Sequence, residues 1–166
     1  GSPYLAGFTK DNLASDKLAF PSNLGGYDGV VMRFAAGDGS VTWSNQHGTG
    51  ADDVEWSVAA YKNSRVVVGG YTKGNFEGYQ AMGNEDAYIV RVSSAGTSLG
   101  VRQFGTPGSD TDPLVNNGIM NVSIYGPNVA LNRSGDVVLA GSTNSAIWGQ
   151  GNAGARDAYV TMLPSP

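Results

Sequence analysis

One pattern of residues occurs three times along this chain, and no other feature limits the possible folds so strongly. In each copy a short apolar segment passes through glycine and ends in threonine. The copies occupy residues 4–9, 67–72 and 138–143. A second pattern follows each of them and begins at an aspartate, at Asp28, Asp86 and Asp157. Because the two patterns keep the same order, the chain is predicted to be a tandem repeat.

The residues within each unit indicate short β-strands joined by tight turns. Apolar residues alternate with polar ones or form brief β-branched runs, and Gly, Asn, Asp and Ser bound them. A full unit is predicted to hold four strands. Residues 37–40 and 132–135 suit hairpin turns that require positive φ. The predicted strands are residues 4–9, 28–34, 41–47, 56–61, 65–72, 86–92, 99–104, about 129–132, 136–143 and 157–163.

Composition excludes several other classes of protein. Glycine occupies 25 of the 166 positions and charged residues make up only 14%, which argues against a helical bundle. The hydrophobic share of 40% argues against disorder. The net charge of −4 gives no basic surface for nucleic acid, and no run approaches the ~18 apolar residues of a membrane span. Cysteine is absent, so disulfides and thiol chemistry are excluded.

The fold class predicted from this repeat is all-β, with tandem four-stranded antiparallel blades of β-propeller type. The chain, read as one β-repeat domain over 1–166, divides into a partial blade at 3–48, a full blade at 49–105 and a partial blade at 106–164. This amounts to about two and a half to three blades, whereas a closed propeller needs about four or more. We therefore expect self-association or further blades from a longer parent chain, or a different kind of closure.

The repeat also resembles a known family. The features that carry the resemblance are the strand ending Gly-Gly-Tyr-Thr, the strand opening Asp-Ala-Tyr, and a Gly-Ser-x-x-Trp hairpin that leads into Gly-Thr-Gly-x-Asp-Asp. They are similar to the SBBP β-propeller repeat family, and the likeness is best over residues 24–72. The second Gly-Thr-Gly-x-Asp-Asp copy departs from the pattern, and about a dozen residues are inserted near 113–125. The resemblance implies propellers in secreted or cell-surface proteins.

Aromatic residues in the loops are the first candidates for a binding site. Tyr79 and Trp148 lie in equivalent loops between the second and third strands, and Phe20 takes that place in the first copy. Such rings stack on sugars or anchor a protein partner. The alternative is that they anchor the loops over the core.

Acidic loops are the second candidates. Asp52, Asp53, Asp110 and Asp112 provide the oxygen ligands that Ca²⁺ prefers. Two other readings remain open: the carboxylates accept hydrogen bonds from turn amides, or they form a glycosidase pair.

Two further sets of residues are predicted to be structural. Asp28, Asp86 and Asp157 occur in every unit, so they are predicted to bond local backbone amides at strand starts. His47 is the single histidine, and Phe104 stands at its place in the next unit, which indicates a packing or surface position.

The notable residues recur from unit to unit, and no set of catalytic residues occurs just once in the sequence. This favours a non-enzymatic module. We expect an extracellular or cell-surface domain that binds a protein or glycan, or serves adhesion or scaffolding, with no cofactor apart from the possible Ca²⁺. The alternatives are a carbohydrate-active hydrolase on a propeller scaffold and a Ca²⁺-stabilised structural repeat.

Overall fold

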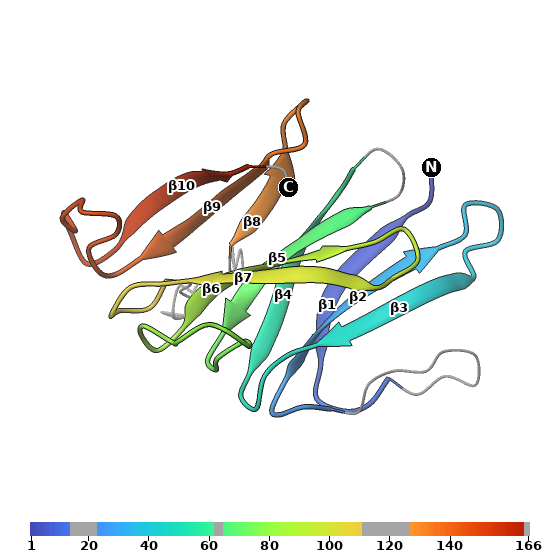
Figure 1. Cartoon of the computed structure of the whole chain (residues 1–166), viewed down its shortest axis with the longest axis horizontal. Helices are drawn as coiled ribbons and strands as arrows, with labels where there is room; N and C mark the ends of the chain where they lie inside the picture. Colours follow the sequence, from blue (N-terminus) through green and yellow to red (C-terminus); the bar gives the residue numbers. More distant parts are fainter. Residues whose placement is uncertain (14–22, 62–64, 111–126, 165–166) are drawn as a thin grey trace, which may run out of the picture.

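The chain forms three antiparallel sheets (Figure 1). The computed structural model describes residues 1–13, 23–61, 65–110 and 127–164. The first sheet has the order β1-β2-β3, the middle sheet β4-β5-β6-β7 and the third β10-β9-β8. The strands are β1 Tyr4–Thr9, β2 Asp28–Phe34, β3 Val41–His47, β4 Asp53–Ala60, β5 Val66–Thr72, β6 Asp86–Val92, β7 Ser98–Phe104, β8 Asn128–Leu131, β9 Val137–Thr143 and β10 Asp157–Leu163.

All ten predicted strands are confirmed, most of them to within a residue. The largest difference is in β4, which begins at Asp53 instead of residue 56. A bulge between Glu55 and Ser57 makes Trp56 an extra residue of β4 in its register with β5. The extra residue breaks the alternation of side chains along β4, which hid the start of the strand.

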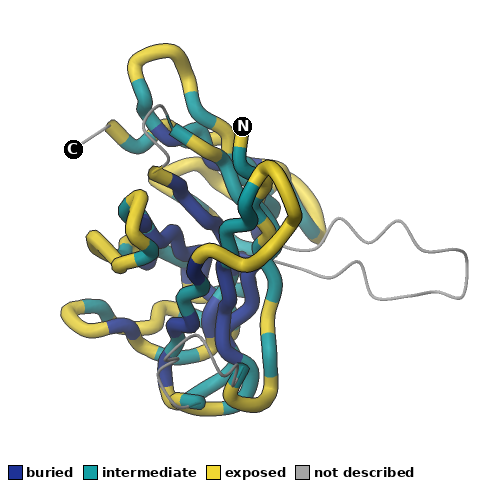
Figure 2. The backbone as a smooth tube through the Cα atoms, turned by 90° about the vertical axis from the view of Figure 1, so that its right-hand side faces the viewer, coloured by how far each residue is buried: buried dark blue, intermediate teal, exposed yellow. Residues whose placement is uncertain are grey.

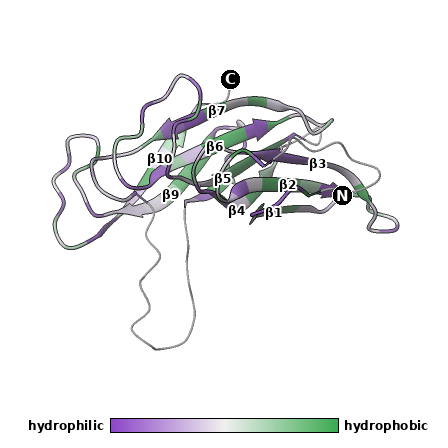
Figure 3. Cartoon of the chain, turned by 90° about the horizontal axis from the view of Figure 1, so that it is seen from below, coloured by the Kyte–Doolittle hydropathy of each residue, from purple (hydrophilic) through white to green (hydrophobic). Residues whose placement is uncertain are grey.

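The middle sheet is buried on both faces. One face packs on the first sheet through residues that include Val31, Trp43 and Val90, and the other packs on the third sheet through Ile89 and Leu139, among others. Stacking of this kind explains the unbroken Val66–Val68 run, since both orientations of side chain are covered. Figure 2 shows the buried backbone running through the centre, and Figure 3 shows apolar stretches along β2 and β6.

Glycine makes the hairpin turns as predicted. Gly39, between β2 and β3, has φ 70°, and Gly135, between β8 and β9, has φ 89°. Gly96 plays the same part between β6 and β7, with φ 86°. These left-handed conformations cost an L side chain about 1 kcal/mol or more.

The structure shows an all-β fold with small antiparallel sheets, but these sheets do not close on themselves within the described residues. Among the strands that the structure describes, none in the first sheet is equivalent to β4 and none in the third is equivalent to β7. In the parts of the chain that the structure describes, no helix is long and apolar enough to cross a membrane.

Candidate functional site

The aspartate that opens the third strand of each unit binds its own preceding turn. In each case a carboxylate oxygen accepts the backbone N–H of the residue four positions earlier. The donors are Leu24 to Asp28 at 2.9 Å, Met82 to Asp86 at 3.0 Å and Ala153 to Asp157 at 2.6 Å. The prediction of strand-start aspartates that bond local amides is confirmed.

Asp53 and Asp110 repeat that arrangement at the start of the next unit. Asp53 accepts the N–H of Thr49 at 2.6 Å and its hydroxyl at 2.9 Å. Asp110 accepts the N–H and the hydroxyl of Thr106 at 2.5 and 2.9 Å. Both carboxylates are buried, and burial raises the pKa of Asp53. Turn chemistry is therefore confirmed for these two residues, whereas Asp112 lies outside the described residues.

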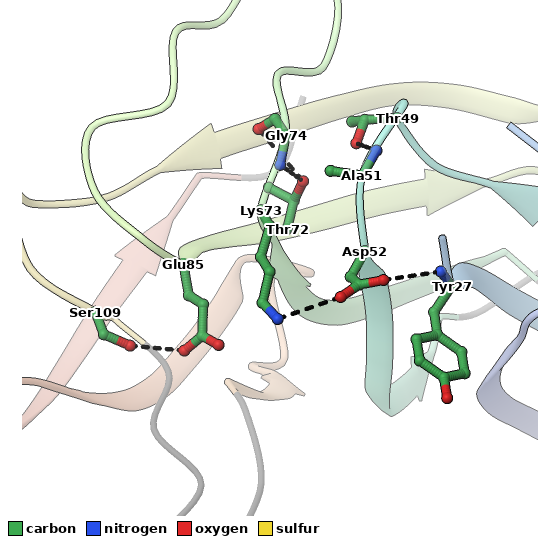
Figure 4. A network of polar contacts seen from close by, with 9 residues as sticks. All are labelled: Tyr27, Thr49, Ala51, Asp52, Thr72, Lys73, Gly74, Glu85 and Ser109. Carbon is green, nitrogen blue, oxygen red and sulfur yellow. Dashed lines mark hydrogen bonds and ion pairs between the residues drawn. The ribbon is translucent and has the colours of Figure 1, made fainter. Parts of the chain in front are cut away.

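Asp52 joins the first sheet to the middle one (Figure 4). Its carboxylate accepts the Tyr27 N–H at 3.2 Å and pairs with the Lys73 ammonium at 3.2 Å. The next junction repeats the connection, because the Ser109 hydroxyl donates to Glu85 at 2.7 Å. The acidic loops thus lie where consecutive sheets meet, and they hold these sheets together.

The described residues offer no group of three or more His, Asp or Glu side chains arranged to hold a metal ion. His47 lies buried with its Nε2 against Glu55 Oε1, and its Nδ1 is 3.1 Å from Asn45 Oδ1. A packing position for His47 is confirmed.

A small pocket lies between the edges of the middle and third sheets. Its volume is about 210 Å³, below the ~300–1,000 Å³ that surrounds a drug-sized ligand, so it suits one side chain or one sugar ring. β7 and β10 form two sides, and the loops that precede β6 and β10 supply aromatic rings. The pocket is lined by Tyr79, Arg102, Gln103, Phe104, Trp148, Thr161 and Leu163.

Trp148 is the exposed ring of this pocket, with 56% of its surface accessible. Its ring stands edge-on to Tyr159, with centroids 5.7 Å apart, and lies 6.4 Å from the Phe104 ring. Its φ of 49° is the one positive value at a non-glycine among the described residues. The fold therefore holds a large apolar side chain in solvent on a strained backbone, which is a pattern typical of functional positions.

The pocket brings together two of the three aromatic residues that the sequence singled out. Tyr79 is half-buried and its hydroxyl donates to the Val101 carbonyl at 3.1 Å, so it also anchors its loop to β7. Phe20 lies outside the described residues. Arg102, Thr161 and Leu163 were missed, because only the packing of two sheets brings these strand residues together.

Comparison of the chain with protein-family models and with curated proteins finds no match.

Proposed function

We propose that this chain is a non-enzymatic binding module of β-propeller type that recognises an extended segment of a protein partner at the edge of its third sheet. The observation that carries the proposal is the position of the aromatic pocket directly beside β10. Thr161 and Leu163 of β10 line the pocket, and the structure describes no strand on the far side of β10. An open strand edge supplies main-chain hydrogen bonds to a partner, and a pocket beside it selects a side chain.

The propeller itself is supported by how the units stack. The innermost strand of the middle sheet, β4, contacts β1 of the first sheet and β8 of the third, so the inner edges of the three sheets gather on one side. Equivalent hydrogen bonds connect consecutive sheets: Asp53 N–H donates to Tyr27 O, and Asp110 N–H donates to Glu85 O. Blades arranged around an axis have this kind of repeated neighbour relation.

The exposed face of the third sheet supports a further unit or a second copy. Val160 is 70% exposed and Met162 is 59% exposed, whereas Ile89, at the place of Val160 in the middle sheet, is 1% exposed. Apolar residues in these positions are covered where another sheet follows. Light scattering at high protein concentration tests self-association: a dimer or larger species supports it, and a monomeric mass contradicts it.

A binding role is favoured over hydrolysis by the state of the acidic residues. Asp53 and Asp110 are buried and accept amide and hydroxyl hydrogen bonds, and Asp52 pairs with Lys73. Through these contacts each carboxylate stabilises the place where two consecutive sheets meet. The extracellular or cell-surface location belongs to the same proposal and rests on the SBBP-like repeat.

The test is selection of binders from a displayed library of random nonapeptides, with Trp fluorescence as the readout. We expect selected peptides to change the fluorescence of the parent protein, and Trp148→Ala, which removes the reporter ring, to weaken their binding at least tenfold when binding is measured by titration calorimetry. Leu99→Ala is the matched control, since Leu99 is 55% exposed on β7 but does not line the pocket. Failure to select any peptide, together with fluorescence changes on adding glucose, N-acetylglucosamine or glucuronic acid, would show a glycan site instead.

A further inference from the structure

The fourth strand, where the structure describes one, carries a glutamine that bonds the aspartate at the start of the neighbouring third strand. In the middle sheet, Gln103 Nε2 donates to Asp86 Oδ2 at 2.9 Å and to the Gly74 carbonyl at 3.0 Å. Its Oε1 accepts the Phe76 N–H at 3.0 Å. In the first sheet, Gln46 Nε2 donates to Asp28 Oδ2 at 2.8 Å. The amide thus fixes the fourth strand to the strand-start aspartate in both copies.

The residues that follow this glutamine are also determined by the structure. A Cβ at Gly48 would lie 2.6 Å from Asp28 Oδ1, and one at Gly105 would lie 2.0 Å from Asp86 Oδ1. Glycine is needed because the backbone passes directly over the carboxylate. The threonine after it binds the aspartate of the next unit, as Thr106 binds Asp110. Each fourth strand therefore ends in Gln, then His or Phe, then Gly-Thr.

The third sheet has hydrogen-bond acceptors equivalent to those that bind this glutamine in the middle sheet. Asp157 accepts the Ala153 N–H as its two counterparts accept theirs. The Thr143 hydroxyl bonds Ser145 in the way that the Thr72 hydroxyl bonds Gly74, so the Ser145 carbonyl stands at the place of the Gln103 acceptor. Within the described chain no glutamine reaches Asp157, because β10 pairs only with β9.

We infer that the edge of β10 accepts a fourth strand with the pattern Gln, aromatic or His, Gly, Thr, supplied by another unit of this repeat. The inference rests on the proposed function and specifies its partner. Pairing is antiparallel, and its register follows the first and middle sheets, where Gln46 lies opposite Val30 and Gln103 opposite Tyr88. The incoming glutamine therefore lies opposite Tyr159 and donates to the Asp157 carboxylate.

The same register fills the aromatic pocket. Val101 lies opposite Val90 in the middle sheet and packs against the core that this sheet shares with the first. The equivalent residue of an incoming strand lies opposite Thr161, which lines the pocket together with Leu163. Two positions before the glutamine the middle sheet has Val101 and the first sheet has Ser44, and the pocket beside β10 favours the apolar residue at that place.

The test uses a synthetic peptide with the sequence of residues 98–106, Ser-Leu-Gly-Val-Arg-Gln-Phe-Gly-Thr, added to the whole chain. We expect one peptide to bind per chain, with slower hydrogen exchange at β10 amides and not at β1 or β3. Replacing the peptide glutamine by alanine should weaken binding about tenfold, since a hydrogen bond to a charged group is lost. Replacing its glycine by alanine should weaken binding at least as much.

A double-mutant cycle tests whether the peptide glutamine binds the Asp157 carboxylate. In Asp157→Ala the glutamine and alanine peptides should bind equally, whereas Asp38→Ala, which changes an exposed turn, should leave the difference intact. Peptide binding that ignores the glutamine, or protection at β1 or β3, would overturn the inference while leaving the proposed function standing. If no peptide binds, including peptides from the random library, both proposals fail. Since the peptide changes leave the protein untouched, poor folding of Asp157→Ala would not spoil the test.

Discussion

The carboxylate of Asp86 lies 2.9 Å from the amide nitrogen of Gln103 on β7, and the same contact recurs at 2.8 Å between Asp28 and Gln46. Both pairs are buried, and each aspartate also accepts an amide of its preceding turn. One carboxylate therefore positions both the turn before the third strand and the end of the fourth. This double role explains why the aspartate recurs in each unit, and why the glutamine recurs in both units that have a fourth strand.

The contact predicts unequal costs for equivalent substitutions. Asp86→Ala removes the acceptor of the Met82 N–H and one of the two acceptors of the buried Gln103 side-chain amide, so it should lower the free energy of unfolding by about 3 kcal/mol. Asp157→Ala removes the acceptor of a single exposed amide and should cost about 1 kcal/mol. Urea denaturation followed by circular dichroism measures both. Equal losses would show that the Gln103 contact adds nothing.

Gly105 should not tolerate a side chain. An added Cβ would lie 2.0 Å from Asp86 Oδ1 and 2.9 Å from Asp110 Oδ2, so one of two buried carboxylates would have to move. Gly105→Ala is expected to destabilise the fold by about 1–3 kcal/mol. Gly50→Ala is the matched control: it has nothing within 4 Å of its Cβ and should stay within about 0.5 kcal/mol of the parent. Thermal unfolding of the two variants decides the point.

Trp148 should show an inverted preference between glycine and alanine. In an ordinary exposed position alanine is the more stable of the two, because glycine has more conformational entropy to lose. At φ 49° an L residue is strained, so Trp148→Gly should be more stable than Trp148→Ala by about 1 kcal/mol. Both variants lack the ring contacts to Tyr159 and Phe104, so these cancel in the comparison. Chemical denaturation in which alanine is the more stable would show that the backbone is relaxed.

The strands could be predicted from the sequence because their signals are local. The Asp28–Phe34 and Asp86–Val92 strands begin at aspartate, hold apolar residues and end before turns that require positive φ at Gly39 and Gly96. The start of β4 was missed because the bulge at Glu55 and Ser57 interrupts its alternation. Local patterns therefore locate strands well, except where an extra residue changes which side chains face inward.

The site was only half predictable for a related reason. Tyr79 and Trp148 stood out as aromatic residues in equivalent loops, and the structure places both at one pocket. Arg102 and Leu163 gave no such signal, since their roles depend on how β7 and β10 face each other across two sheets. The Gln-x-Gly-Thr segment occurs twice in the sequence. Its hydrogen bond to the strand-start aspartate became clear only from the strand register, which places Gln103 opposite Tyr88.

Asp53 should make stability depend on pH in the opposite sense from an ordinary surface carboxylate. Burial raises its pKa above the usual 3.8, and the hydrogen bonds from Thr49 only partly oppose this. Between 3.8 and the raised value the folded state binds more protons than the unfolded state, so the contribution of Asp53 to stability falls as the pH rises through this window. Asp53→Asn removes that slope. Unfolding free energies of parent and variant, measured from about pH 3 to pH 7, should therefore shift in favour of the variant as pH rises.

Asp38→Asn is the control with the reverse sign, because hydrogen bonds from Ser40 lower the pKa of the exposed Asp38 carboxylate. Its parent-minus-variant difference should shift toward the parent as pH rises, and a parallel response of the two variants would contradict the assignment.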